Sequence, residues 1–241
     1  MSILSDMFHD MTSLLYPVRC SCCGGLLMGR AEWICVGCRG AIPLTLYHLD
    51  PSNLMAKRLK DICPEVETVI AQFYYHHNNR WRRMVHDIKY FRSWYMAYRM
   101  GGLYGDQLRK AKIFQDIDII IPIPLHPRRQ ILRGYNQSEL IAQGIGKSLK
   151  IKVDASAVIR KRHNISQVST LNKDSRWGNV HGVFSVIHPE RLEGKKILII
   201  DDVFTTGATV ASCIEALKSV PSCKISVATL AVSHNEIIGN T

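Results

Sequence analysis

The sequence contains no apolar run approaching the roughly 18 to 20 residues that span a bilayer. Its first residues, MSILSDMFHDMTSLLYPV, include acids and lack the basic segment and continuous apolar stretch of a secretory signal. Internal repeats and low-complexity tracts are also absent, so we expect little disorder. These absences predict a globular cytoplasmic protein without a transmembrane segment. Its eight cysteines would then be thiols or metal ligands rather than disulfides.

Acidic residues are scarce relative to basic ones. Asp and Glu number 20 against 31 Lys and Arg, which leaves a net charge of +11. This balance favours polyanionic partners such as phosphorylated small molecules, nucleic acid or an anionic membrane surface. It does not choose among them, and a generally basic solvated surface accounts for it equally well.

Five of the cysteines cluster near the start of the chain, and four of these form two CxxC pairs. Each pair makes a tight turn that can aim two thiolates at one centre, and four sulfurs in a tetrahedron suit zinc. Because sulfur fills every coordination position, we predict a structural zinc ribbon rather than a catalytic metal site. The predicted ligands are Cys20, Cys23, Cys35 and Cys38.

Unrelated buried cysteines are the alternative interpretation of this cluster. Cys22 is the fifth member and can substitute for a neighbour, although the spacing favours the two regular pairs. Cys63, Cys213 and Cys223 lie far apart on apolar segments, and we interpret them as packing residues.

Strand-like and helix-like segments alternate after residue 67. This order predicts an α/β domain with a mostly parallel sheet flanked by helices, and with ligands at the carboxyl ends of the strands. We predict an N-terminal helix and zinc ribbon in residues 1–45, a connector with one short helix in 46–67, and the α/β domain in 68–241. Strands are expected at 68–75, 116–124, within 151–159, and at 182–187, 195–202 and 224–232, and helices at 81–91, 95–111, 136–150 and 205–220.

The most informative segment is ILIIDDVFTTGAT, residues 197–209. An apolar strand ends in Asp201 and Asp202, and a turn rich in threonine then leads into a helix. The free N–H groups of a helix start, with threonine hydroxyls, suit a phosphate monoester, and Gly207 lets the backbone approach it. The two carboxylates can accept hydrogen bonds from vicinal hydroxyls about one sugar ring away. The segment therefore predicts a ribose 5-phosphate site.

A capped helix that follows a strand ending in acids is the alternative interpretation of the same residues. Capping explains one Thr or Asp, but not five polar groups around a glycine. The segment also lacks the GK[ST] of a Walker P-loop.

ILIIDDVFTTGAT resembles the signature with which type I phosphoribosyltransferases bind phosphoribosyl pyrophosphate (PRPP). Nearly the whole chain also resembles the ComF family, which joins a zinc ribbon to a phosphoribosyltransferase domain. One small departure is Tyr135, where a Phe is common. The further motifs that carry the resemblance are Leu14 to Pro17 with the double CxxC, Lys89 with Tyr90, residues 122–142, residues 160–167, and Arg176 with Asn179 ahead of Phe184.

The resemblance implies a type I phosphoribosyltransferase fold that binds PRPP with Mg²⁺, beside a structural Zn²⁺ in the ribbon. Mg²⁺ would bridge the diphosphate and the sugar hydroxyls with few direct protein ligands. The segment from Pro122 to Leu125 would form the loop that receives pyrophosphate. The implied PRPP-binding residues are Asp201, Asp202, Thr205, Thr206, Gly207, Ala208, Thr209, Pro122, Ile123 and Pro124.

Three arginines follow that loop and look like part of the mobile loop that closes over the site in such enzymes. Arginines there can pair with pyrophosphate oxygens and stabilise the charge that develops on the leaving group. A solvated basic loop is the alternative. The implied catalytic residues are Asp201, Asp202, Arg128, Arg129 and Arg133.

Other basic residues have weaker assignments. Residues 160–167 can line the acceptor side, contact nucleic acid, or do neither. Lys89 at the end of a helix is also favourable for the helix dipole alone. His126 can exchange a proton near the pyrophosphate loop, but a lone His is more often an ordinary surface residue.

Two functions remain open at this stage. The first is an enzyme that transfers phosphoribosyl from PRPP to an unknown acceptor. The second, implied by the resemblance, is a non-catalytic PRPP- or nucleotide-responsive protein of DNA uptake and natural transformation. It would contact single-stranded DNA or competence proteins. A scaffold with a decayed site is disfavoured, because the acids, threonines and glycine of the signature are all present.

Overall fold

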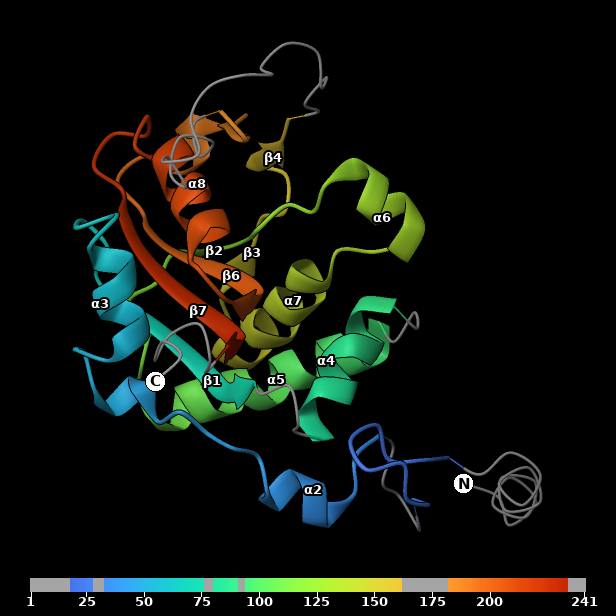
Figure 1. The fold of residues 1–241 in the computed structure, drawn as a ribbon. Helices are drawn as coiled ribbons and strands as arrows, with labels where there is room; N and C mark the ends of the chain where they lie inside the picture. The colour runs from blue at the N-terminus through green and yellow to red at the C-terminus, as the bar shows by residue number, and fades with distance from the viewer. Residues whose placement is uncertain (1–17, 28–32, 76–79, 91–93, 162–181, 234–241) are drawn as a thin grey trace, which may run out of the picture.

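A parallel sheet of five strands forms the centre of the computed structural model, which describes residues 18–27, 33–75, 80–90, 94–161 and 182–233 (Figure 1). The four isoleucine and leucine residues at 197–200 are fully buried, as expected of a strand covered on both faces. In spatial order the strands are β1 (Val69–Tyr75), β7 (Lys224–Ser233), β6 (Lys196–Phe204), β2 (Ile119–Pro122) and β3 (Lys152–Val153).

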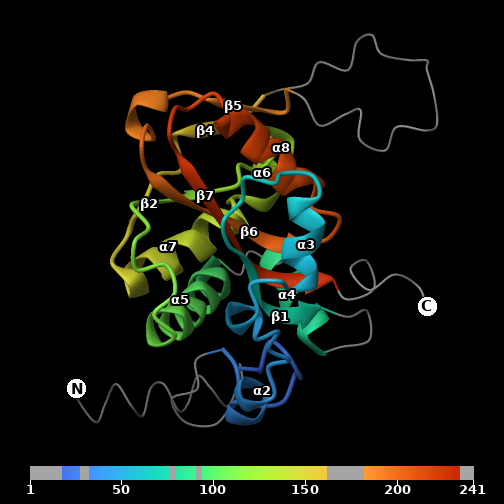
Figure 2. The ribbon, with the colours of Figure 1, turned by 90° about the vertical axis from the view of Figure 1, so that its left-hand side faces the viewer.

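Helices cover both faces of this sheet (Figure 2). One layer contains α5 (Trp94–Lys110) and α7 (Gln137–Leu149), and the other contains α3 (Leu54–Lys60) and α8 (Ala208–Leu217). This arrangement confirms the predicted α/β class, with a mostly parallel sheet flanked by helices. None of the helices within the described ranges has the length and apolar character to cross a membrane.

The order of the strands reverses at β2. From β2 the chain passes to β3 on one side, and it then crosses to β6 on the other side. In an open parallel sheet, such a reversal leaves a crevice beyond the carboxyl ends of the two strands, where ligands bind. The reversal therefore places the candidate site between the ends of β2 and β6.

Two of the predicted strands differ from the prediction in their pairing. The strand predicted within 151–159 is divided into β3 and β4 (Val158–Arg160), and β5 (Phe184–Val186) pairs with β4 in a separate antiparallel ribbon. The division has a local cause, because the Asp154 carboxylate accepts hydrogen bonds from the N–H groups of Ser156 and Ala157. These bonds turn the chain away from the main sheet.

The predicted connector packs directly against β1. It contains a short 3₁₀ helix (Tyr47–Leu49) besides the predicted helix α3, and the Asn53 side chain caps α3 and donates to the carbonyl of Val69. Met55 and Leu59 on α3 are fully buried. Helix α3 of this connector therefore packs into the core beside β1.

Three further helices lie around the sheet and at the front of the chain. They are α2 (Val36–Gly40) in the cysteine-rich segment, α4 (Arg80–Tyr90) beside it, and α6 (Pro127–Arg133), which extends away from the sheet (Figure 1). A 3₁₀ helix also covers Pro189–Arg191.

Helices α5 and α7 pack with their backbones in close approach. A Cβ on Gly101 of α5 would overlap the carbonyl oxygen of Ile141 on α7, and a Cβ on Gly144 would overlap that of Tyr98. Gly102, the next residue of α5, has no neighbouring atom within 4 Å of the position of a Cβ. Small residues at this contact therefore set the distance between the two helices.

We expect Gly101→Ala to lower the free energy of unfolding by about 1–3 kcal/mol, because the helices must separate to admit the methyl group. Gly102→Ala is the matched control and should be neutral or stabilising by up to about 1 kcal/mol, since alanine favours helix and meets open space. Urea denaturation of the two variants measures both values. Equal stabilities would contradict this description of the contact.

Candidate phosphoribosyl site and cysteine cluster

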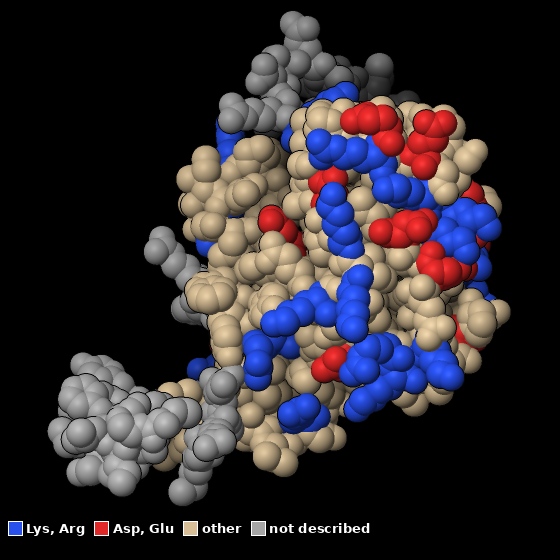
Figure 3. Space-filling model, turned by 180° about the vertical axis from the view of Figure 1, so that it is seen from behind, with Lys and Arg blue, Asp and Glu red and all other residues tan. Residues whose placement is uncertain are grey.

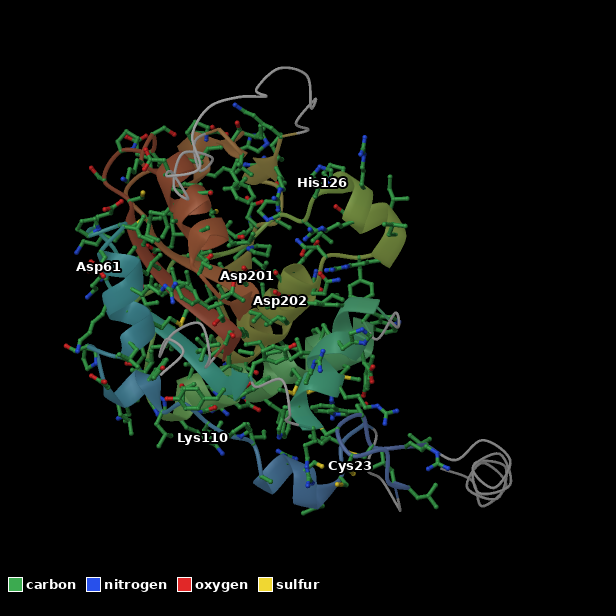
Figure 4. All side chains as sticks on the ribbon, in the orientation of Figure 1. Cys23, Asp61, Lys110, His126, Asp201 and Asp202 are labelled. Carbon is green, nitrogen blue, oxygen red and sulfur yellow. The ribbon has the colours of Figure 1, made fainter. Side chains whose placement is uncertain are left out.

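Asp201 and Asp202 lie side by side at the predicted crevice (Figure 4). Strand β6 continues through both residues to Phe204, so the acids lie within the strand rather than at its end. Beside them, the N–H of Ile123 donates to the carbonyl of Ile200 at 2.9 Å and extends the contact of β2 with β6. Two of the sequence motifs, 122–124 and 197–209, thus meet at one point.

Asp201 is held by hydrogen bonds from two elements. Ser138 at the start of α7 donates its hydroxyl to Oδ1 at 2.9 Å, and the N–H of Asp202 donates to the same oxygen at 2.8 Å. Burial and the neighbouring Asp202 carboxylate raise the pKa of Asp201 to about 7, against the opposing effects of these bonds and of Lys89. Asp201 therefore changes charge close to neutral pH.

Asp202 is paired with a cation from α4. The Lys89 ammonium lies 3.0 Å from Oδ2, and the N–H of Val203 donates to Oδ1 at 2.7 Å. Both side chains of the ion pair are mostly buried, with 26% of Lys89 and 16% of Asp202 exposed. Lys89 therefore belongs to the site and does not serve the helix dipole alone.

The turn that opens α8 follows directly after β6. Gly207 has a φ of 84°, and a Cβ on it would lie 2.8 Å from Cζ of Phe204, so both the backbone and the packing require glycine. Thr205, Thr206 and Thr209 are exposed around this turn. The Thr206 hydroxyl accepts from the N–H of Ala208 at 3.4 Å, but the N-cap residue of α8 is Gly207, so side-chain capping does not account for these threonines.

The predicted pyrophosphate loop is anchored to the same place. Pro122 is the last residue of β2, and the carbonyl of Ile123 accepts from the Asn136 side chain at 3.0 Å. Asn136 also caps α7, because its Oδ1 accepts from the N–H of Ser138. One capped helix start thus holds both this loop and the hydroxyl that reaches Asp201.

Ser138 was not predicted as a site residue. The only sequence feature that pointed to Ser138 was its position at the predicted start of the helix.

The prediction of a mobile loop around the three arginines is wrong in one respect, because the segment is helix α6. His126 caps this helix by accepting from the N–H of Arg128, and Gly134 ends it with a φ of 80°. The His126 side chain is thus engaged as a helix cap. Arg128 and Arg129 are exposed on α6, whereas Arg133 donates to Gln137 at 3.0 Å.

Arg160 on β4 is a further cation near the site. Its guanidinium lies 5.4 Å from the ring centre of Phe184, and burial together with Arg129 lowers its pKa while Asp201 opposes that effect. The guanidinium therefore lies in the electrostatic range of both Arg129 and Asp201. Two cations whose charges interact, one on α6 and one on β4, are suited to bind one anion.

Several predicted motif residues fall outside the described part of the chain. They are Leu14 to Pro17, Arg162, His163, Gln167, Arg176 and Asn179.

The four predicted ligand cysteines come together at the opposite end of α4. Their Sγ atoms all lie within 4.8 Å of one another, and those of Cys23 and Cys35 are 4.0 Å apart. The N–H of Cys35 donates to the sulfur of Cys20 at 3.4 Å, as is favourable for thiolates. This group of four sulfurs fits a metal ion such as zinc.

The other cysteines lie outside this group. Cys22 is buried nearby but is not one of the four, as its spacing predicted. Cys63 and Cys213 are buried in the core and Cys223 is half-buried, which agrees with packing roles.

The phosphoribosyl transferase domain model matches residues 136–237 of this chain. The match begins at the Asn136 cap and includes the acids, the glycine turn and β7. It therefore covers the strand–turn–helix of the candidate site, but neither the cysteine cluster nor α4.

Among curated proteins, the chain is 33% identical over 137 residues to the DNA utilization protein YhgH of Escherichia coli O6:H1. That alignment covers 56% of this chain and only 59% of the relative. Competence protein F of Haemophilus influenzae is 33% identical over 43% of the chain and 45% of its own length. Competence protein ComFC of Bacillus subtilis is 22% identical over 76% of the chain and 77% of its own length.

We expect Cys38→Ser to abolish stoichiometric zinc binding, since it removes one of the four sulfurs at the centre. Cys22→Ser is the matched control and should keep about one zinc per chain, because its sulfur is outside the group. Atomic emission spectroscopy of the purified variants measures the metal. Loss of zinc from Cys22→Ser with retention in Cys38→Ser would contradict the assignment.

Proposed function

We propose that this chain, a phosphoribosyltransferase-like protein of the ComF family, binds Mg·PRPP in the crevice between β2 and β6. The observation that carries the proposal is the position of two carboxylates on β6 immediately before the glycine turn that opens α8. A sugar phosphate needs this pair of features, a diol acceptor and a phosphate cradle one ring apart.

Each part of PRPP has a counterpart in the site. The ribose hydroxyls would donate to Asp201 and Asp202, and the 5-phosphate would lie against the turn at 205–209. The pyrophosphate would lie beside residues 122–124, between the cations Arg129 and Arg160. The bound Mg²⁺ would supply charge compensation at the diphosphate.

Transfer of the phosphoribosyl group would proceed at C1 of the ribose. The bond from C1 to the pyrophosphate oxygen breaks, its electron pair leaves with pyrophosphate, and an acceptor atom bonds to C1 and releases its proton. Arg129 and Arg160 would stabilise the charge on the leaving group. The acceptor is a nucleophile of unidentified class.

A role in DNA uptake is the second candidate, and the names of the relatives favour it. In that function PRPP is a ligand and not a substrate, and the net charge of +11 suits contact with single-stranded DNA. On the face in Figure 3, acids lie among the cations in the upper part, whereas the lower part carries mostly cations. Ion pairs such as Lys224 with Glu67 and Lys218 with Glu65 reduce the free positive charge of the described surface. Release of pyrophosphate during incubation with candidate acceptors separates the two functions.

We expect Asp201→Asn to weaken Mg·PRPP binding roughly 10- to 100-fold, because a charge-assisted hydrogen bond to the diol is lost. Asp106→Asn is the matched control, since Asp106 is an exposed acid on α5 that pairs with Arg109, and it should bind like the wild type. Isothermal titration calorimetry measures both dissociation constants. A wild-type protein that does not bind Mg·PRPP, or equal affinities for wild type and Asp201→Asn, would exclude the proposed site.

The affinity for Mg·PRPP should also rise as the pH increases from 6 to 8. The pKa of Asp201 is raised to about 7, and ribose hydroxyls donate to the ionised carboxylate. Below pH 7 a proton must first leave Asp201, which costs up to about tenfold in affinity per pH unit. Phosphate groups of the ligand titrate near pH 6 as well. The quantity to compare at each pH is therefore the difference in Mg·PRPP affinity between wild type and Asp201→Asn. Parallel pH profiles would contradict the role of Asp201.

A further inference from the structure

Helix α4 extends from the cysteine cluster to the acid pair. Its eleven residues span roughly 16 Å. In Figure 4, the cluster around Cys23 lies beyond one end of the helix, and Asp201 and Asp202 lie toward the other. The phosphoribosyl transferase domain model begins after this helix, at residue 136.

The first turn of α4 is bound to the cysteine-rich segment. A guanidinium nitrogen of Arg80 lies 3.8 Å from the sulfur of Cys38, and the Trp81 indole N–H donates to the carbonyl of Ala41 at 3.3 Å. Cys38 belongs to α2, and Ala41 is the residue that caps its end. These contacts attach α4 to the one helix that carries a ligand cysteine.

The last turn of α4 is bound to the phosphoribosyl site. Lys89 lies 3.0 Å from the Asp202 carboxylate, and the carbonyl of Ile88 accepts a hydrogen bond from the hydroxyl of Tyr135. Tyr135 directly precedes Asn136, the cap that also holds Ile123 and Ser138. The end of α4 thus contacts an acid on β6 and the residue that precedes the cap of α7.

Between its ends, α4 is held by a single buried stripe. Trp81, Met84, Val85 and Ile88 recur at the three- and four-residue spacing of one helix face, and all are buried. The Trp81 ring lies 5.5 Å from that of Phe73 on β1. A short helix fixed along one face moves as a unit, so a displacement at the cysteine end also shifts Lys89.

We propose that α4 couples the metal-loaded cysteine cluster to the sugar-phosphate site, with Lys89 as the residue that positions Asp202. The proposal rests on the proposed PRPP-binding function. Asp201 and Asp202 repel each other, and the Lys89 ammonium offsets that repulsion only while α4 keeps its place. Metal in the cluster fixes Cys38 and Ala41, and through Arg80 and Trp81 these residues fix the helix. Occupancy of the cluster therefore raises the affinity for PRPP.

A double-mutant cycle tests this coupling. Calorimetry with Mg·PRPP compares wild type, Arg80→Ala, Lys89→Met and the double variant, all loaded with zinc and checked for zinc content and circular dichroism. We expect Lys89→Met to weaken binding about tenfold or more and Arg80→Ala about fivefold, within the usual range of coupling between sites. The double variant should bind like Lys89→Met alone, because Arg80 acts through Lys89.

Two cations on α5 provide matched controls for these variants. Arg109→Ala and Lys110→Met remove exposed charges from the last turn of that helix, and both should bind PRPP like the wild type. Lys89→Arg should recover most of the affinity, since it keeps a cation opposite Asp202. If the effects of Arg80→Ala and Lys89→Met multiply in the double variant, the coupling through α4 is excluded while the PRPP site stands.

Hydrogen–deuterium exchange provides a measurement that needs no PRPP. Removal of zinc by a chelator should increase exchange at residues 84–90 of the wild type, beyond the turn that contacts the cluster. In Lys89→Met these amides should exchange faster even with zinc present. Unchanged exchange at 84–90 after complete removal of the metal would overturn the proposal. If the wild type shows coupled exchange but does not bind PRPP, the proposed ligand is wrong and the link between the two centres remains.

Discussion

The structure depends on how two adjacent carboxylates are held inside a parallel strand. Burial of a charge is costly unless it is paired or hydrogen-bonded, and two like charges at neighbouring positions add repulsion. The protein meets this constraint with Lys89 from α4, Ser138 from α7 and the backbone N–H groups of β6 itself. Burial and the Asp202 charge still raise the pKa of Asp201, so this compensation is partial.

This constraint explains why distant parts of the chain meet at the crevice. Asn136 organises the start of α7, and that helix start then holds both Ile123, which follows β2, and Asp201 on β6. The reversal of strand order at β2 provides the space between them. Helix α4 brings in the compensating cation, and its other end reaches the cysteine cluster. The cluster and the site are thereby parts of one connected arrangement.

Local patterns predicted the elements well but not their partners. The apolar run at 197–200 identified β6, and the spacing of apolar residues at 81–88 identified α4. By contrast, 182–187 was predicted correctly as a strand, yet β5 pairs with β4 outside the main sheet. Pairing depends on contacts between residues far apart in the chain, and period-two patterning does not encode the partner. The segment 127–133 was expected to be a mobile loop because of the resemblance to type I phosphoribosyltransferases, although a His cap, an N-terminal proline and a terminal glycine favour the helix that forms.

The sequence by itself determined the α/β class, the four cysteines that converge, and the strand, acid pair and glycine turn of the candidate site. Each of these follows from residue spacing or from a motif contained within a few residues. Tertiary structure alone decided that Lys89 pairs with Asp202, that Ser138 reaches Asp201, and that Arg160 on β4 interacts electrostatically with Asp201. These residues lie far from Asp201 and Asp202 in the chain, and only the packing of α4, α7 and the β4–β5 ribbon around the sheet brings their charges together.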